Sequence, residues 1–215
     1  MISIRPNQLF QLLNQSDEPI WFQIPNRGGL MTLESLILVS LIKIINAKNV
    51  FEFGTYEGFT TRLMIENLPK SGTVTTIDID SVDGVIFEGV DEKLAKKSLE
   101  SIREYSFSNR RGQVEQIIMN TMEFSIDGRE GKFDMVFVDA NHHVKYAERD
   151  TENSFKLIGE KGCIVWHDYK NPNHPSLTDF LDNLSDTKKL YHIEETMMVI
   201  YLPGIEMPTS KADKV

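Results

Sequence analysis

The sequence predicts an α/β fold: a mostly parallel sheet of seven strands with an antiparallel carboxyl-terminal hairpin and helices on both faces. Two observations predict this fold. From Asn49 onward, short apolar or β-branched runs alternate with longer helical stretches, which is typical of strands buried on both faces of a parallel sheet. Near the end of the chain, two extended runs follow each other with almost no residues between them, so we expect them to pair antiparallel.

The seven strands are expected in two groups. The parallel group consists of the runs Val50–Phe53, Thr73–Ile77, Val114–Met119, Met135–Val138 and Cys163–Trp166. The antiparallel pair consists of Tyr191–Glu195 and Met197–Tyr201, and we expect it at one edge of the sheet.

The helices are predicted from apolar residues that return at helical spacing. The stretches are Asn7–Asn14, Leu33–Ala47, Thr60–Asn67, Asp91–Tyr105, His143–Ile158 and Leu177–Leu184. We expect Thr32 to be the N-cap of the second helix, with Glu34 in its first turn, and Asp150 to be an exposed acid on the fifth.

The composition excludes several classes of protein. The 215 residues include 23 Lys and Arg against 32 Asp and Glu, a formal net charge of −9, which disfavours nucleic acid or an anionic membrane as a partner. We interpret the local basic strip of Arg103, Arg110 and Arg111 as solvated surface. The single cysteine, Cys163, excludes a disulfide framework and a multi-cysteine zinc site.

No segment predicts secretion or membrane insertion. The amino-terminal residues lack a continuous apolar region, so we expect no secretory signal. The longest apolar stretch, Leu36 to Ala47, is interrupted by Ser40, Lys43 and Asn46 and is too short to span a bilayer. We therefore expect a cytoplasmic protein without membrane partners.

Small or polar residues follow every parallel strand. In an open parallel sheet, ligands bind at the carboxyl ends of the strands, so these residues are expected to converge on one site. They are Gly54-Thr55-Tyr56-Glu57-Gly58, Asp78 with Asp80, Asn120-Thr121, Asp139-Ala140-Asn141-His142-His143 and His167-Asp168-Tyr169.

The first two of these segments predict an adenosine ligand without a diphosphate. Gly54 and Gly58 would let a ligand approach the backbone of a tight turn at the start of a helix. Their Gly-x-x-x-Gly spacing lacks the third glycine of the dinucleotide fingerprint, which disfavours a nicotinamide oxidoreductase. Asp78 ends the second strand, where a carboxylate can accept hydrogen bonds from both hydroxyls of a ribose. The competing interpretation is a turn glycine followed by a solvated acid.

The segment Val50–Leu63, with TVTTIDID and FDMVFVDANHH after it, resembles the class I S-adenosylmethionine-dependent methyltransferases, which have a Rossmann-like fold. The similarity is strongest to the catechol O-methyltransferase-like branch and related small-molecule O-methyltransferases, and it extends from about Leu30 to Leu202. The resemblance implies S-adenosylmethionine as cofactor. It places the methionine part against Gly54, Thr55, Tyr56 and Gly58, with Glu52 and Asp139 alongside, the ribose at Asp78, and the adenine between Thr121 and Met122.

The resemblance also divides the chain into three parts. Residues 1–48 would be a helical segment that covers the active site, 49–202 the cofactor-binding core and 203–215 a polar tail. The loop Ser81–Val90 is the only sizeable insertion, and the sequence assigns it no role.

Asp139 and Asp168 are candidate ligands of a divalent cation. They end neighbouring strands, roughly 5 Å apart across the sheet, where two carboxylates either share a proton or bind a cation. Oxygen ligands favour a hard ion such as Mg²⁺ or Mn²⁺, which makes a bound hydroxyl easier to deprotonate. The resembled branch has an asparagine after the second aspartate, and here Tyr169 stands in its place. The third ligand is therefore open between Asn141, His142 and water, and both carboxylates also fit structural hydrogen bonding.

His142 and Asp139 are the candidate catalytic residues. His142 lies where the resembled branch has a basic lysine, and an imidazole with an ordinary pKa near 6.5 can accept a hydroxyl proton. A metal ligand or a neighbour of a helix N-cap are the alternative roles for His142. We expect His167 to orient Asp168 or the substrate, and His174 and His192 to fill surface or core.

Two functions remain in competition. The first is methyl transfer to a small-molecule acceptor, at a hydroxyl oxygen. The second is a non-catalytic nucleoside-binding scaffold with the same fold. The apolar front helices would allow a homodimer.

Overall fold

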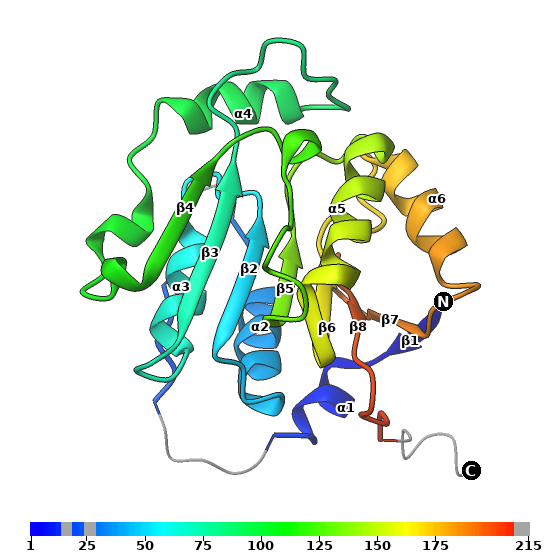
Figure 1. Cartoon of the computed structure of the whole chain (residues 1–215). Helices are drawn as coiled ribbons and strands as arrows, with labels where there is room; N and C mark the ends of the chain where they lie inside the picture. The colour runs from blue at the N-terminus through cyan, green and yellow to red at the C-terminus, as the bar shows by residue number, and fades with distance from the viewer. Residues whose placement is uncertain (14–18, 24–28, 209–215) are drawn as a thin grey trace.

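A computed structural model describes residues 1–13, 19–23 and 29–208 of the chain. Its centre is one sheet of eight strands in the order β1-β7-β8-β6-β5-β2-β3-β4 (Figure 1). The strands are β1 (Ile2–Ile4), β2 (Asn49–Phe53), β3 (Thr73–Asp78), β4 (Val114–Ile118), β5 (Phe133–Val138), β6 (Ile158–Trp166), β7 (Leu190–Ile193) and β8 (Val199–Tyr201).

Five adjacent strands confirm the predicted parallel sheet. Strands β4, β3, β2, β5 and β6 pair in parallel in that order, so the chain runs outward from β2 in one direction and from β5 in the other. The boundary between these two directions lies between β2 and β5. An open α/β sheet binds its ligand at such a boundary, outside the carboxyl ends of the strands.

The prediction of seven strands is wrong by one. Strand β8 pairs antiparallel with both β6 and β7, as predicted, but β1 adds to β7 in parallel and forms the edge. A three-residue strand carries no measurable periodicity, and its neighbours determine it: Glu194 N–H donates to Ile4 C=O at 2.8 Å. The hairpin therefore lies inside the sheet.

The helices are α1 (Pro6–Phe10), α2 (Thr32–Ile44), α3 (Phe59–Asn67), α4 (Asp91–Leu99), α5 (Val144–Leu157) and α6 (Pro175–Leu184). Helix α1 ends earlier than predicted, and Asn14, the predicted last residue, lies outside the described residues. Thr32 is the first helical residue and not the N-cap, which is Met31.

The predicted single helix Asp91–Tyr105 is also wrong. Helix α4 ends at Leu99, and a short 3-10 helix follows at Glu104–Phe107. Between them Arg103 turns its guanidinium inward onto the C=O groups of Tyr56 and Ser98, and Glu104 N–H donates to Glu57 C=O at 2.7 Å. These contacts with the β2–α3 turn determine the break.

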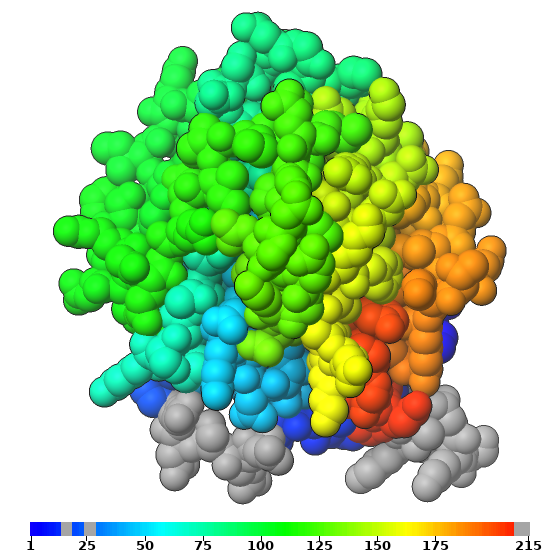
Figure 2. Space-filling model, in the orientation of Figure 1, coloured from blue at the N-terminus to red at the C-terminus, as the bar shows by residue number. Residues whose placement is uncertain are grey.

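Helices cover both faces of the sheet, as predicted, and each face has its own apolar core. Alternate residues of β2 point to opposite faces: Val50 packs with α1, α2 and α3, whereas Phe51 and Phe53 pack under α5 and α6. In Figure 2, α5 and the loop after β4 cover much of the second face. The boundary predicted at residue 48 stays a prediction, because α2 shares a core with the strands.

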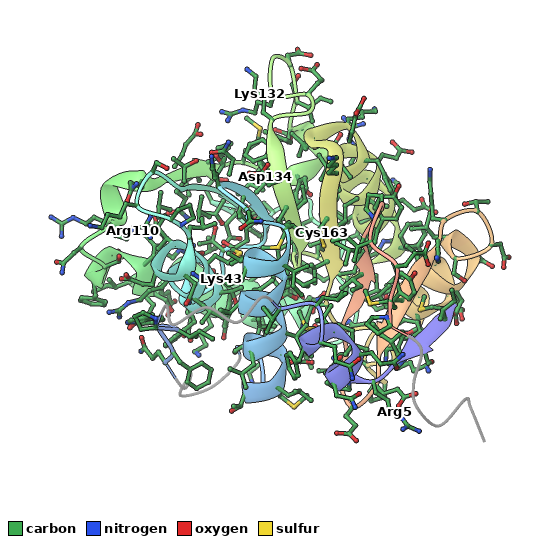
Figure 3. All side chains as sticks on the ribbon, turned by 90° about the horizontal axis from the view of Figure 1, so that it is seen from below. Arg5, Lys43, Arg110, Lys132, Asp134 and Cys163 are labelled. Carbon is green, nitrogen blue, oxygen red and sulfur yellow. The ribbon has the colours of Figure 1, made fainter. Side chains whose placement is uncertain are left out.

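The amino ends of the strands are closed by polar contacts. Asp134 Oδ2 accepts the backbone N–H groups of Lys48 and Asn49 at 2.8 and 2.9 Å, and Figure 3 shows Asp134 and Lys132 at this end. The carboxyl ends, at the opposite side, are left to bind a ligand. Of the tail predicted at 203–215, residues 209–215 lie outside the described residues.

Within the ranges 1–13, 19–23 and 29–208, no helix combines the length and apolar character needed to cross a membrane.

Candidate functional site

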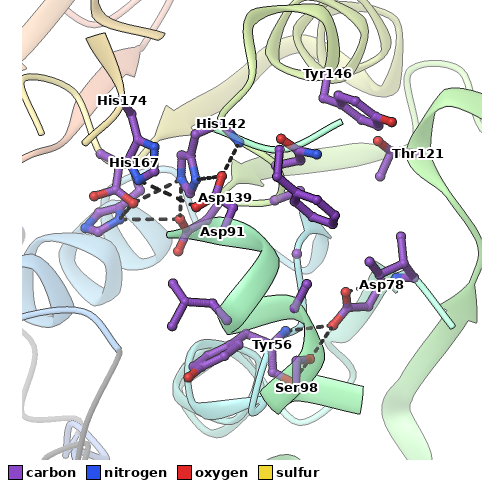
Figure 4. Close-up of a pocket in the computed structure, with 18 of the residues that line it drawn as sticks. Tyr56, Asp78, Asp91, Ser98, Thr121, Asp139, His142, Tyr146, His167 and His174 are labelled. Atoms are coloured by element: carbon purple, nitrogen blue, oxygen red, sulfur yellow. Dashed lines mark hydrogen bonds and ion pairs between the residues drawn. The ribbon is translucent and has the colours of Figure 1, made fainter. Parts of the chain in front are cut away.

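A cavity of about 320 Å³ opens at the carboxyl ends of the central strands. Its walls come from the ends of β3 and β5, the turn after β2, helix α4 and the loop that precedes it, and the segment after β6 (Figure 4). The predicted convergence of strand ends is therefore correct. Predicted residues that line the cavity are Gly54, Tyr56, Asp78, Thr121, Asp139, His142, His167 and Asp168.

Gly54 and Asp139 mark the boundary between the two directions of the sheet. Gly54 has φ +94°, and a Cβ atom there would lie 2.1 Å from Asp139 O. Asp139 N–H in turn donates to Phe53 C=O at 2.9 Å. Only glycine allows this close approach of the two backbones, which brings the turn after β2 and the end of β5 together at the edge of the cavity.

The Asp78 carboxylate is held by the residues around it. Oδ2 accepts Tyr56 N–H at 2.9 Å and lies 3.3 Å from the Arg103 guanidinium, while Oδ1 accepts Ile79 N–H at 2.9 Å. Burial raises the pKa of Asp78, and the nearby Arg103 opposes this shift. Asp78 lines the cavity, and a carboxylate oxygen can accept more than one hydrogen bond. Arg103 is thus an internal partner of Asp78 and not part of a solvated basic strip.

Four predicted cofactor residues do not line the cavity. Glu52 is fully buried, and its Oε2 accepts the hydroxyls of Thr61 and Thr76 at 2.5 and 2.6 Å. Thr55 is also buried and shares a hydrogen bond with Thr76 at 2.7 Å. The other two, Gly58 and Met122, lie at the start of α3 and in a short 3-10 helix after β4. Glu52 and Thr55 therefore stabilise the β2–α3 turn through buried hydrogen bonds and do not face the cavity.

Thr121 lies between the cavity and a buried carboxyl group. Asp150, predicted to be exposed, is fully buried on α5, which corrects that expectation. Burial raises the pKa of Asp150 to about 7, and the nearby Thr121 side chain opposes the shift. Helix α5 packs against the segment that carries Thr121, so its inner face includes this acid.

The loop Ser81–Val90 forms the roof of the cavity. Val85, Phe87 and Val90 line it, and Asn141 Nδ2 donates to Ile86 C=O at 2.7 Å. The insertion that the sequence left without a role therefore supplies an apolar cover over the ligand site.

The floor of the cavity joins two aspartates with two histidines. His142 Nε2 lies 3.0 Å from Asp168 Oδ2 and 3.5 Å from Asp139 Oδ1. His167 Nδ1 lies 3.4 Å from the same two oxygens. Asp168 has φ +61°, a strained conformation for a residue with a side chain, and such strain is common at functional sites. The predicted group of Asp139, His142 and Asp168 is therefore brought together.

Burial opposes protonation of both histidines, but their carboxylate neighbours outweigh it. Contacts with Asp139, Asp168 and Asp91 hold the pKa of His142 well above its ordinary value. The pKa of His167 is raised in the same way, by Asp139, Asp168 and Glu34. Burial alone would raise the pKa of Asp168, but the contacts with His142 and His167 together have the larger effect and lower it.

Glu34 links the front helix to this floor. Its side chain is fully buried, and Oε2 accepts Met31 N–H at 2.9 Å and lies 3.2 Å from His167 Nε2. Oε1 accepts Met197 N–H at 2.9 Å. The acid predicted for the first turn of the helix is present, and it also anchors His167.

Two further residues, Asp91 and His174, were not predicted as part of the site. Asp91 Oδ2 accepts both the backbone N–H and Nδ1–H of His142, each at 3.0 Å. His174 stacks on His142 with ring centroids 4.1 Å apart, and its Nε2 lies 3.6 Å from Asp91 Oδ1. His174 is therefore neither an isolated surface residue nor a core filler. His192, in contrast, is buried and bonds Thr196 C=O, as expected of a core histidine.

Asp139 and Asp168 form, with His142, a group whose possible ligand atoms lie within 4.8 Å of one another. Tyr169, which follows Asp168, turns its hydroxyl away and donates to Asp182 Oδ1 at 2.7 Å. The imidazole nitrogens of His142 and His167 already face both carboxylates. Mg²⁺ keeps several water ligands and is held by as few as one or two carboxylates, so the divalent-cation site expected at Asp139 and Asp168 stays a prediction.

Comparison with known proteins identifies the family. Residues 51–169 match the family model described as a methyltransferase domain. The chain belongs to this family. Among curated relatives of this methyltransferase domain, tapetum-specific methyltransferase 1 of Arabidopsis thaliana is 28% identical over 64% of the chain and 54% of its own length. Caffeoyl-CoA O-methyltransferase 1 of Eucalyptus globulus is 30% identical over 54% of the chain and 44% of its own length. The matches thus span about half the length of these relatives.

Solved structures of methyltransferases share the fold. The O-methyltransferase TomG of Streptomyces achromogenes, in complex with SAM, superposes with a TM-score of 0.54 at 19% identity over 82% of each chain. An O-methyltransferase of Bacillus cereus, in complex with SAH, gives 0.55 at 16% identity over 81% of this chain and 82% of its own. The predicted resemblance to class I S-adenosylmethionine-dependent methyltransferases is confirmed.

Proposed function

We propose that the protein transfers a methyl group from S-adenosylmethionine to a hydroxyl oxygen of a small molecule, with His142 as general base. The observation that carries this proposal is the placement of His142 and Asp139 in one cavity with Gly54 and Asp78. Asp139 and Gly54 approach each other between β2 and β5, where an open α/β sheet binds its ligand. His142 Nε2 lies 3.5 Å from Asp139 Oδ1.

The cavity offers a separate group for each part of the cofactor. The close approach at Gly54 and the positive φ of Tyr56 would accommodate the methionine part, and Asp78 Oδ1 would accept a ribose hydroxyl. Asn120 and Thr121 line the far end, where the adenine would lie. Glu52, Thr55 and Gly58 would support this site through the turn, without contact.

The chemistry requires alignment and removal of one proton. When bound, S-adenosylmethionine supplies an electrophilic methyl group on a positively charged sulfur. The acceptor hydroxyl has to lie in line with the breaking C–S bond, and its proton passes to His142 Nε2 as the O–C bond forms. Asp91 lies against Nδ1 on the opposite side of the ring, and Nε2 faces Asp139 and Asp168 on the cavity floor. Asp139 and Asp168 then stabilise the imidazolium that results.

This mechanism uses no divalent cation. Mg²⁺ or another divalent ion at Asp139 and Asp168 stays a prediction, and proton transfer to His142 does not depend on it. The expected acceptor is a small molecule, and neither nucleic acid nor a homodimer is required by this proposal.

Calorimetric titration of S-adenosylhomocysteine into folded, ligand-free protein is the primary test. Micromolar binding, roughly −8 kcal/mol, is expected both with Mg²⁺ and with EDTA. A screen of hydroxyl acceptors with labelled methyl donor then follows, beginning with catechol and caffeoyl compounds. His142→Ala and Asp139→Ala are expected to abolish transfer. Binding with no transfer to any acceptor would favour the nucleoside-binding scaffold. Loss of transfer in the presence of EDTA would show that the reaction requires a divalent cation.

A further inference from the structure

A second group of possible ligands lies beside the floor, on the opposite side of the His142 ring. Asp91, His142 and His174 each offer one ligand atom, and these atoms lie within 4.8 Å of one another. The three residues come from the start of α4, the loop after β5 and the start of α6. They are 5%, 8% and 2% exposed, so the site is enclosed.

We propose that Asp91, His142 Nδ1 and His174 form a binding site for a transition-metal ion of the Zn²⁺ type. Two imidazole nitrogens and one carboxylate are a donor set that suits Zn²⁺, whereas Mg²⁺ prefers oxygen alone. Three protein ligands leave a fourth tetrahedral position, and all three residues also line the cavity.

An unpaired polar atom supports this site. Asp91 Oδ1 is buried and accepts no hydrogen bond within the described part of the chain. The 3.6 Å between Asp91 Oδ1 and His174 Nε2 is also too long for a hydrogen bond. A buried polar atom without a partner costs stability, and an ion bound between Asp91 Oδ1 and His174 Nε2 would supply that partner.

The far side of His142 has the surroundings of a metal-bound histidine. Ligating histidines usually donate their other ring N–H to a carboxylate, which fixes the tautomer. Here His142 Nε2 lies 3.0 Å from Asp168 Oδ2. With a metal on Nδ1, Nε2 carries the proton and faces the Asp168 carboxylate, so the proximity of Nε2 to Asp168 is retained.

The site has a consequence for catalysis, and this consequence rests on the proposed function. A metal on Nδ1 leaves Nε2 as an N–H donor, which cannot accept a proton from the acceptor. Occupancy by zinc and action of His142 as a base therefore exclude each other. The zinc-bound protein is expected to bind S-adenosylhomocysteine but not to transfer methyl groups.

The test is metal binding to chelator-treated protein, followed by calorimetry with Zn²⁺ and by visible absorption with Co²⁺. Wild type is expected to bind one Zn²⁺ and to give the intense absorption of tetrahedral Co²⁺. His174→Gln is expected to weaken Zn²⁺ binding by about 100-fold, since it removes one ligand. His192→Gln is the matched control, because His192 is also buried but lies outside the group, and it is expected to bind as wild type does.

Two results would overturn the proposal. One is the absence of stoichiometric Zn²⁺ binding to the wild-type protein. The other is Zn²⁺ binding that Asp139→Asn abolishes and His174→Gln does not, which would place the ion between Asp139, His142 and Asp168 instead. Binding of S-adenosylhomocysteine, measured on the same zinc-free samples, tests the cofactor site separately, so failure of one proposal is distinguishable from failure of the other. Circular dichroism establishes that each variant is folded.

Discussion

The Asp91 carboxylate holds His142 at two points, because a single oxygen accepts both the backbone N–H and the ring Nδ1–H at 3.0 Å. Asp91 belongs to the first turn of α4, 51 positions before His142 in the chain. The orientation of the proposed base therefore depends on a helix that contributes no other residue to the His and Asp floor.

Asp91→Asn tests this dependence. The amide still fits the space but is a weaker acceptor, so His142 loses its preferred tautomer. We expect kcat for methyl transfer to fall about 10- to 100-fold, with the affinity for S-adenosylhomocysteine changed less than threefold, on the scale of lost orienting partners. Glu92→Gln, at the exposed next position, is the control. Equal losses in affinity and kcat would mean that Asp91 acts only on folding or on the cofactor site.

Gly54→Ala is expected to abolish S-adenosylhomocysteine binding. The added Cβ would meet Asp139 O at 2.1 Å at a φ of +94°, so the turn and the strand end cannot both keep their positions. Gly128→Ala is a matched control, because Gly128 also has a positive φ but no atom within 4 Å of the added Cβ, and it does not line the cavity. Calorimetry compares the two variants. Equal binding by both would show that the Gly54 turn does not contact the cofactor.

Asp78→Ala is expected to weaken S-adenosylhomocysteine binding by at least about 100-fold. The variant removes the ribose acceptor and also leaves Arg103 without its carboxylate partner, which is a strong charge-assisted contact. Asp80→Ala, two residues further on and exposed, serves as the control in the same titration. Unchanged affinity in Asp78→Ala would place the ribose elsewhere.

The rate of methyl transfer is expected to rise with pH. His142 accepts a proton only in its neutral form, and its surrounding carboxylates hold its pKa above the ordinary 6.5. The profile of kcat/KM in zinc-free buffer should therefore increase through an inflection above pH 6.5. His192→Gln should leave the profile unchanged. An inflection below pH 6.5, or a flat profile from pH 5.5 to 9, would contradict the assignment of His142 as the base.

The buried carboxyl group of Glu52 is expected to make the folding stability depend on pH. Burial raises the pKa of Glu52 from 4.5 to about 8, against the hydrogen bonds from Thr61 and Thr76. An acid whose pKa is raised on folding stabilises the folded state most below its unfolded pKa, and this contribution is lost as pH rises from 4.5 to 8. The loss is roughly 5 kcal/mol at most.

Glu52→Gln cannot titrate and should lack this loss. Urea unfolding at pH 5 and at pH 8.5 is therefore expected to show a smaller decrease in stability for Glu52→Gln than for wild type. Glu148→Gln, an exposed acid on α5, should follow the wild type. Parallel curves for Glu52→Gln and wild type would mean that Glu52 is ionised in the folded protein.

The central sheet and the convergence at its carboxyl ends could be predicted from the sequence. Strands buried on both faces produce continuous apolar runs, and parallel strands bring the residues after them to one edge. Asp139, His142 and Asp168 are therefore neighbours for a reason that local sequence expresses. Tyr169 could also be recognised as a departure from the expected ligand set, and the structure shows its hydroxyl on Asp182.

Contacts between distant segments could not be predicted. Asp91 reaches His142 from the first turn of α4, and His174 stacks on it from the start of α6, so neither is marked by its position after a strand. Asp150 was misjudged for a related reason: its place on α5 suggests an exposed face, but a segment after β4 covers it. The edge strand β1 depends on the backbone of β7, which a three-residue pattern cannot reveal.

Helix α4 both lines the cavity and holds His142. Leu94, Ala95 and Ser98 form part of the cavity wall, while Asp91 at the start of the same helix orients His142. A movement of α4 that admits the methyl donor would release His142 as well. The shape of the cavity wall and the orientation of the proposed base are therefore linked through one helix, and a displacement of α4 would change both together.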